Sequence, residues 1–171
     1  LWVSLSRAAV DEAMRRGVFA RGFKKAVQVS STLADDTETL LARSATDALA
    51  MAGKAGQVIS GFAKTKSALA SGEAVALIHA ADGSDDGIRK LGAKLAALTR
   101  ETAEKPANLP IIKVFTTDEL DLALGRSNVV HAAVLAGPAS KTFLARCQML
   151  DRYRQAAGNR TGSKDGRTTG A

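Results

Sequence analysis

The sequence predicts an α/β fold: a three-layer α-β-α sandwich with a small mixed four-stranded sheet, plus a short N-terminal α/β remnant. Helical and strand-like patterns alternate along residues 37–155, which is typical of a sheet covered by helices on both faces. Apolar residues make up 46% of the 171 residues and aromatic residues only 4%, so the core must be aliphatic. The predicted strands are residues 58–59, 74–78, 110–115 and 129–135.

Residues 1–28 form a first, basic unit. Trp2–Leu5 have the pattern of a short strand, and Ser4 or Ser6 is placed to cap a helix that runs to about Arg16. A segment of about 28 residues cannot bury much surface alone. We therefore expect it to pack on another part of the protein or to be the remnant of a larger module.

Residues 29–36 indicate a linker, and the main domain follows it. Asp36 is placed to cap a helix that runs to about Ala52. Apolar residues recur along this helix at a spacing that predicts one buried face. That face is expected to consist of Leu40, Leu41, Ala45, Ala48, Leu49 and Ala52.

Four further helices are predicted between and after the strands. Gly61 opens one that ends near Gly72, and Asp82–Asp86 begin another. Thr116 and Glu119 have the spacing of a capping box. Gly137-Pro138 opens the last helix, with proline at its first position. The expected apolar faces of the second and the last of these helices are Ile88, Leu91, Leu95 and Leu98, and Phe143, Leu144, Cys147 and Leu150.

The charge distribution favours a polyanionic partner such as nucleic acid. The net charge is +7, and residues 1–28 hold six Lys or Arg against two acids. Residues 156–171 hold three against one and contain no apolar anchor, which predicts a disordered basic tail. The chain has no apolar run near the ~20 residues of a membrane helix. It also has no secretory pattern and only one cysteine, which predicts a cytoplasmic protein.

The titratable residues give little material for catalysis, so we expect no enzyme, no metal and no cofactor. His79 and His131 lie in or beside apolar strands and are expected to be core or rim residues. Cys147 lies on an apolar helix face and is expected to be a small core residue. The acids at 85–86 and 118–119 are explained by the helix dipole.

Residues 53–61 are rich in glycine but lack the Gly-Lys-Ser/Thr ending of a nucleotide-binding loop. A helix N-terminus at Gly61, with Lys54, Lys64 and Lys66 nearby, can hold phosphate without any chemistry. A tight turn with solvated lysines is the alternative.

Four motifs in order resemble the kink-turn-binding ribosomal protein superfamily, especially its bacterial YlxQ-like branch. The first is residues 40–72, and the second is the strand 75–80 with its Ala-Ala-Asp ending. Leu109-Pro110-Ile111-Ile112 resembles the family's "V-P" strand, and residues 119–135 resemble its last loop and strand. The resemblance covers about residues 37–150 and implies RNA binding.

Residues 2–25 resemble the C-terminal part of the YlxR family, through Trp-Val-Ser and Arg-Arg-Gly-Val-Phe-Ala-Arg-Gly-Phe. The expected beginning of that module, including a Gly-Arg-Gly stretch, is absent before Leu1, so we expect a fragment. Proteins that combine both modules resemble RNA-binding proteins of transcription and translation. The basic residues of this part expected to add RNA affinity are Arg15, Arg16, Arg21 and Lys24.

The family's RNA contacts come from the start of one helix and two adjacent loops. Carried over, these are Gly61 to Lys66, the Ala80–Gly83 turn and the Gly125–Asn128 loop. The family's Gly-x-Asn-Glu reads Gly61-Phe62-Ala63-Lys64 here, so the hydrogen bonds of Asn and Glu to kink-turn bases cannot form. The RNA-binding residues expected on this domain are Lys54, Gly61, Phe62, Lys64, Lys66, Gly125, Arg126, Ser127 and Asn128.

The resulting prediction is a non-catalytic protein that binds structured RNA, with ribosomal RNA among the candidates, as an accessory factor in translation, ribosome function or transcription. Two alternatives stay open. One is a protein-interaction module on a ribosome or polymerase partner, and the other is a DNA-binding regulator of the nucleoid type.

Overall fold

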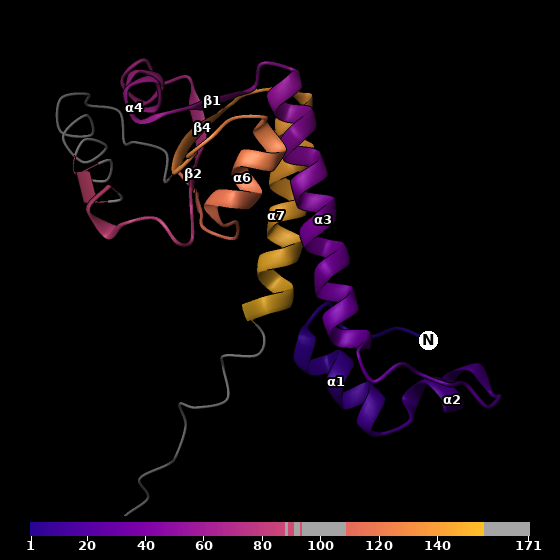
Figure 1. Ribbon diagram of the computed structural model, residues 1–171. Helices are drawn as coiled ribbons and strands as arrows, with labels where there is room; N and C mark the ends of the chain where they lie inside the picture. The colour runs from indigo at the N-terminus through magenta and orange to yellow at the C-terminus, as the bar shows by residue number, and fades with distance from the viewer. Residues whose placement is uncertain (88, 91–92, 94–108, 156–171) are drawn as a thin grey trace, which may run out of the picture. The chain divides into compact units, whose positions relative to one another are not determined.

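The computed structural model describes residues 1–87, 89–90, 93 and 109–155 (Figure 1). Two compact units are present: residues 1–41 with the end of the last helix from Met149, here called the N-terminal unit, and residues 42–148, here called the sheet unit. The helices are α1 (Arg7–Arg15), α2 (Val18–Phe23), α3 (Leu33–Lys54), α4 (Phe62–Ala70), α6 (Thr117–Leu124) and α7 (Pro138–Gln155). The strands are β1 (Val58–Ser60), β2 (Ala74–His79), β3 (Ile111–Ile112) and β4 (His131–Leu135).

The four strands form one mixed sheet in the order β1-β4-β2-β3. Strand β4 is antiparallel to both of its neighbours, while β2 and β3 are parallel. Leu77 of β2 lies opposite Ala133 of β4, and Ile78 lies opposite Ala132. Successive residues of a strand face opposite sides, so β2 and β4, which are buried at successive positions, contribute to two separate apolar layers. The predicted mixed four-stranded sheet is confirmed.

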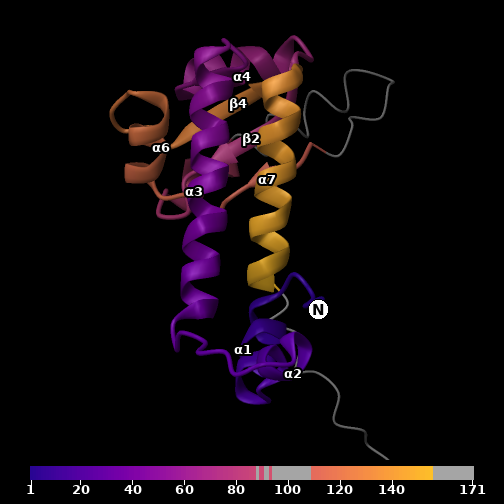
Figure 2. The same cartoon turned by 90° about the vertical axis from the view of Figure 1, so that its right-hand side faces the viewer.

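Helices cover both faces of the sheet, as the three-layer prediction requires (Figures 1 and 2). Helix α4 packs Ala68 and Leu69 against Leu77, Ala133 and a few partly buried neighbours. Within the sheet unit, α6 and the adjoining parts of α3 and α7 lie on the opposite face. The fully buried residues of the sheet unit include Ala45, Leu49, Ala52, Ile78, Phe115, Leu120, Ala132, Val134 and Phe143.

The strand predictions were partly wrong at two places. Trp2–Leu5 form no strand, because all described strands lie in the sheet unit and offer no ladder partner; these residues form neither strand nor helix, and α1 begins at Arg7. Strand β3 is only two residues long instead of the predicted 110–115. Its partner β2 pairs through Ile78 with Ile112 and ends at His79, so little strand is left for further pairing.

Helix α3 begins at Leu33, three residues before the predicted cap at Asp36. Ala45, Leu49 and Ala52 are buried as expected, but Leu40 is 66% exposed and was wrongly placed on the buried face. At 100° per residue, nine positions put Leu40 on the side opposite Leu49.

The other helix predictions concern local capping signals. Ser6 caps α1 by accepting the Ala9 N–H, and Thr116 and Glu119 form the predicted capping box of α6. Helix α2 was not predicted; it starts after Gly17, whose φ of 61° suits glycine.

The predicted helix from Asp82–Asp86 is helical at 85–87. Its expected apolar residues Ile88, Leu91, Leu95 and Leu98 lie outside the described residues, as does the predicted tail 156–171.

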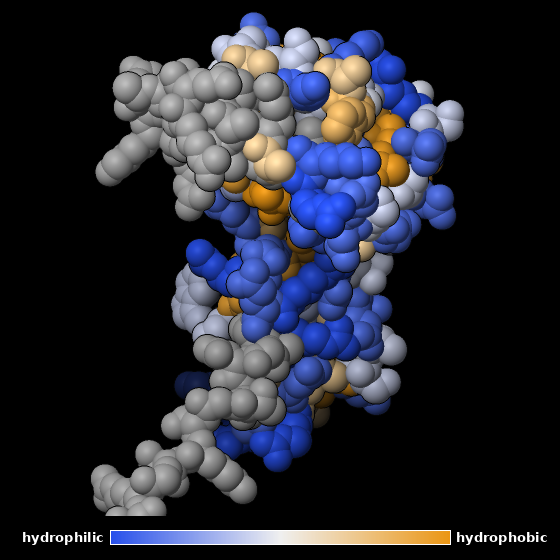
Figure 3. Space-filling model, turned by 90° about the vertical axis from the view of Figure 1, so that its left-hand side faces the viewer, coloured by the Kyte–Doolittle hydropathy of each residue, from blue (hydrophilic) through white to orange (hydrophobic). Residues whose placement is uncertain are grey.

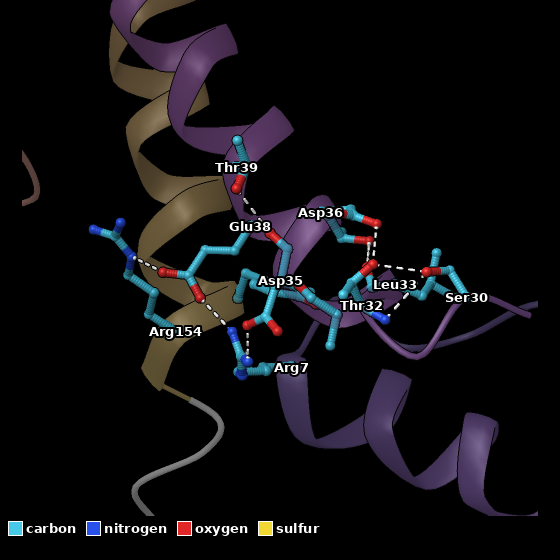
Figure 4. Close-up of polar contacts among 12 residues, drawn as sticks. Arg7, Ser30, Thr32, Leu33, Asp35, Asp36, Glu38, Thr39 and Arg154 are labelled. Atoms are coloured by element: carbon cyan, nitrogen blue, oxygen red, sulfur yellow. Dashed lines mark hydrogen bonds and ion pairs between the residues drawn. The ribbon is translucent and has the colours of Figure 1, made fainter.

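Glu38 of α3 holds two arginines from distant parts of the N-terminal unit (Figure 4). Its carboxylate accepts from Arg7 of α1 at 2.8 Å and from Arg154 of α7 at 2.9 Å. Arg7 also pairs with Asp35. These hydrogen bonds lower the pKa of Glu38 and raise that of Arg7. Beside them, the buried Tyr153 hydroxyl donates to the Ala34 carbonyl at 2.9 Å. The network joins α1, α3 and α7.

Two leucine substitutions in α3 test the assignment of its buried face. Leu49→Ala removes a side chain with 0% exposure and should lower the free energy of unfolding by about 2–5 kcal/mol. Leu40→Ala is the matched control, and its effect should stay within about 0.5 kcal/mol. Urea titrations of both variants make the comparison. Equal decreases would show that the face is wrongly assigned.

Candidate nucleic-acid interface

Three segments far apart in the sequence meet at the start of β4. The Gly61 N–H donates to the His131 carbonyl at 3.0 Å, and the Ala80 N–H donates to the Val130 carbonyl at 2.9 Å. The Gly125–Asn128 loop leads directly into this strand. The start of α4, the Ala80–Gly83 turn and this loop therefore lie together, and we call them the β4 cluster.

Helix α4 presents two cations of the β4 cluster on its exposed side. Lys64 and Lys66 are exposed, whereas Thr65, Ala68 and Leu69 are buried against the sheet. This division follows from the helical spacing of the apolar residues. Gly61 precedes the helix with a φ of 98° and brings no side chain to cap its first turn.

The Ala80–Gly83 turn is fixed by hydrogen bonds to the start of α6. The Ala81 N–H donates to the Phe115 carbonyl at 2.7 Å. The Asp82 carboxylate accepts from the N–H of Thr117 at 2.8 Å and from its hydroxyl at 2.9 Å. These bonds lower the pKa of Asp82, so it stays ionised and engaged with α6.

The Gly125–Asn128 loop is held by one carboxylate. Asp121 of α6 accepts the N–H groups of Asn128 and Val129, both at 2.7 Å. Gly125 and Asn128 have φ values of 59° and 58°, a region that glycine and asparagine tolerate best. Between these two anchored residues, the side chains of Arg126 and Ser127 are exposed.

Two buried histidines lie beneath the β4 cluster and contact each other. The Nδ1 atoms of His79 and His131 are 2.7 Å apart, and the ring centroids are 4.5 Å apart. A hydrogen bond between two Nδ1 atoms requires a proton on one of them and a lone pair on the other. Each residue was correctly expected in the core or at its rim. Their pairing was missed, because only the β2–β4 register brings them opposite each other.

Small and aromatic residues enclose this histidine pair. A Cβ atom on Gly87 would lie 2.5 Å from His131 Nε2, so that position has no room for a side chain. A Cβ atom on Gly83 would lie 2.8 Å from Val130 Cγ1 and 3.2 Å from His79 Nε2. The ring of Phe62 contacts His131 in a T-shaped arrangement, with centroids 5.8 Å apart.

Burial lowers the pKa of both histidines. For His79, the neighbouring His131 and Lys113 add to this lowering, whereas Asp85 and the Ser84 backbone oppose it. Among the described residues, the Nε2 atom of His79 has no hydrogen-bond partner of good geometry. Burial therefore favours the neutral form of both rings.

The remaining predicted RNA-binding residues lie elsewhere. Lys54 ends α3, and strand β1 leads away from it to Gly61, so Lys54 does not join the β4 cluster. Arg15, Arg16, Arg21 and Lys24 belong to the N-terminal unit. Arg15 and Arg16 both pair with Glu12, and Arg21 donates to the Arg16 carbonyl.

The described part of the chain contains no group of three or more His, Cys, Asp or Glu placed to hold a metal ion. None of its helices combines the length and the apolar character needed to cross a membrane.

The histidine pair makes stability depend on pH. An unfolded histidine has a pKa of about 6.5, and the folded values are lower, so the unfolded chain binds more protons as the pH falls below 7. The free energy of unfolding should therefore decrease from pH 7 to pH 5. The chain has only two histidines, so the double variant His79→Leu/His131→Leu should lose this slope in denaturant titrations. A slope that persists in the double variant would assign it to other groups.

Comparison with known proteins shows the fold alone. No protein-family model matches the chain, and no curated protein does. A solved structure of a protein with unknown function from Bacillus halodurans has a TM-score of 0.50 and 20% identity, covering 61% of this chain and 96% of that one. The Giardia lamblia 15.5kD RNA binding protein has a TM-score of 0.47 and 15% identity, covering 65% and 88%. The first of these shows that part of this chain shares its fold with nearly the whole of that solved chain.

Proposed function

We propose that this protein is a non-catalytic RNA-binding protein that uses the β4 cluster to bind structured RNA. The observation that carries the proposal is the convergence of three segments at the start of β4. They are the same three segments to which the sequence resemblance assigns RNA contact, although residues 67–124 lie between the first segment and the last. The predicted cytoplasmic role as an accessory factor in translation, ribosome function or transcription belongs to this proposal.

The charges of the cluster suit a phosphate backbone. Lys64, Lys66 and Arg126 are its cations, and Asp82, which accepts from Thr117 and stays ionised, is its one acid, so the cluster has a net positive charge. The exposed Lys64 and Lys66 form no ion pair with any described residue. Unpaired lysines on a rigid helix contact phosphates without reading the sequence of the bases.

Recognition of the RNA is expected to depend on its shape. Ala63 has no hydrogen-bonding side chain, and Lys64 only donates, so the position of the family's Asn-Glu pair cannot read base edges in the same way. Structured RNA is commonly recognised through backbone geometry and unpaired nucleotides. The proposal therefore includes structured RNA but not kink-turn specificity.

Charge reversal on α4 tests the site. The variant Lys64→Glu/Lys66→Glu should weaken binding to structured RNA by at least tenfold at moderate salt. The slope of log affinity against log salt concentration should fall by about 1 for each phosphate that the variant no longer neutralises. Filter binding across a salt series measures both quantities.

A control with the same change in charge is available on α7 of the sheet unit. Lys141 and Arg146 are exposed there, and Lys141→Glu/Arg146→Glu should retain most of the affinity. Equal weakening in the two double variants would mean that net charge, and not the β4 cluster, determines binding. A preference for duplex DNA at equal salt would favour the DNA-binding alternative, and a partner that survives nuclease treatment would favour the protein-interaction alternative.

A further inference from the structure

We propose that Phe62 is a stacking platform for an unpaired nucleobase, braced by His131, so that the β4 cluster prefers RNA with an unpaired nucleotide. This inference rests on the proposed RNA-binding function and names the feature of the RNA that the site selects. Four properties of Phe62 support it: its exposure, its contact with His131, the rigidity beneath it and the charges beside it.

Phe62 is an exposed aromatic residue on a well-packed helix. It is the first residue of α4, and its relative exposure is 43%, whereas Thr65, Ala68 and Leu69 of the same helix are buried. Its contact with His131 has an interplanar angle of 69°. A T-shaped contact covers at most one face of the Phe62 ring, so the other face is not occupied by this interaction.

The support beneath the ring is rigid. The side chain of His131 is hydrogen-bonded to His79 at 2.7 Å, and Gly87 packs so closely that a Cβ atom there would overlap the ring. The backbone of His131 accepts the N–H of Gly61, which precedes Phe62. The side chain and the backbone of His131 are therefore both fixed before any ligand binds. Phe62 rests on a rigid support, which reduces the entropy cost of binding.

The surroundings of Phe62 fit a nucleotide better than a protein side chain. The exposed residues next to it on α4 are Gly61, Ala63, Lys64 and Lys66, so two cations and no second large apolar residue accompany the ring. Hydrophilic surface also separates small apolar patches on the side of the sheet unit that carries α4 (Figure 3). Protein hot spots need closely packed apolar surroundings, whereas an aromatic ring beside cations is the usual arrangement for an unpaired base and its phosphate.

Stacking also accounts for recognition without the family's Asn and Glu. Every base has an aromatic face, so stacking needs no hydrogen bond to a base edge. We therefore expect a preference for an unpaired nucleotide with little preference for its identity. A base inside a continuous duplex exposes only its edges and cannot stack on Phe62.

The test compares two RNA hairpins that differ only in one bulged nucleotide. The wild-type chain should bind the bulged hairpin more tightly than the fully paired one. Phe62→Leu keeps an apolar side chain but removes the ring, and it should lose affinity for the bulged hairpin by roughly 5- to 150-fold, the range of one base stack. Phe62→Trp should retain the preference. Phe23→Leu, at an aromatic residue that is 55% exposed in the N-terminal unit, is the matched control and should behave as the wild type.

A direct readout uses the fact that Trp2 is the single tryptophan of the chain. In the variant Trp2→Phe/Phe62→Trp, the remaining tryptophan should be quenched by the bulged hairpin and much less by the paired one. Suppose Phe62→Leu binds both hairpins like the wild type, while Lys64→Glu/Lys66→Glu weakens both. The stacking inference is then wrong, and the RNA-binding function stands. Failure of the wild type to bind either hairpin or cellular RNA would overturn both.

Discussion

The hydrogen-bonded position of β4 between β1 and β2 is the constraint on which the candidate surface depends. Its backbone is paired on both sides, and the carbonyls at its start accept N–H groups from Gly61 and Ala80. Such backbone bonds are directional and are rarely left unmade in a buried sheet. The positions of α4, the Ala80–Gly83 turn and the Gly125–Asn128 loop are thus set by the sheet itself. Side chains on the surface can change without moving these segments.

Elements defined by local signals were predicted well from the sequence. The cap at Ser6, the capping box at Thr116 and the start of α7 at Pro138 depend on neighbours within one helical turn. Strands need a partner from elsewhere, and this is why the prediction failed at Trp2–Leu5 and overextended β3. Leu40 was wrongly assigned to the buried face of α3, because it is apolar and adjacent in sequence to Leu41 but lies on the side of the helix opposite Leu49.

At the candidate site too, features that depend on local sequence were predicted, and features that depend on distant partners were missed. The resemblance located three segments that the fold does bring together, but Lys54 was grouped with Gly61 by closeness in sequence, and the extended strand β1 lies between them. The histidine pair joins residues 52 positions apart. The position of each histidine in or beside an apolar strand predicted that it lies in the core or at its rim, while their contact depends on strand register, which no local pattern specifies.

Alanine is the most frequent buried residue in the core of the sheet unit, beside larger residues such as Leu49, Ile78 and Phe143. The alanines with 0% exposure lie in helix α3 and in strands β2 and β4; they are Ala45, Ala52, Ala76, Ala132 and Ala133. Helices lie over both faces of these two strands. At these positions, side chains this small let backbone layers approach closely. The mutational weakness of such a core is crowding: one added methyl group at Ala132 or Ala133 has to push a helix outward. Substitution of these alanines by larger residues would therefore destabilise the domain, even where the new side chain is apolar.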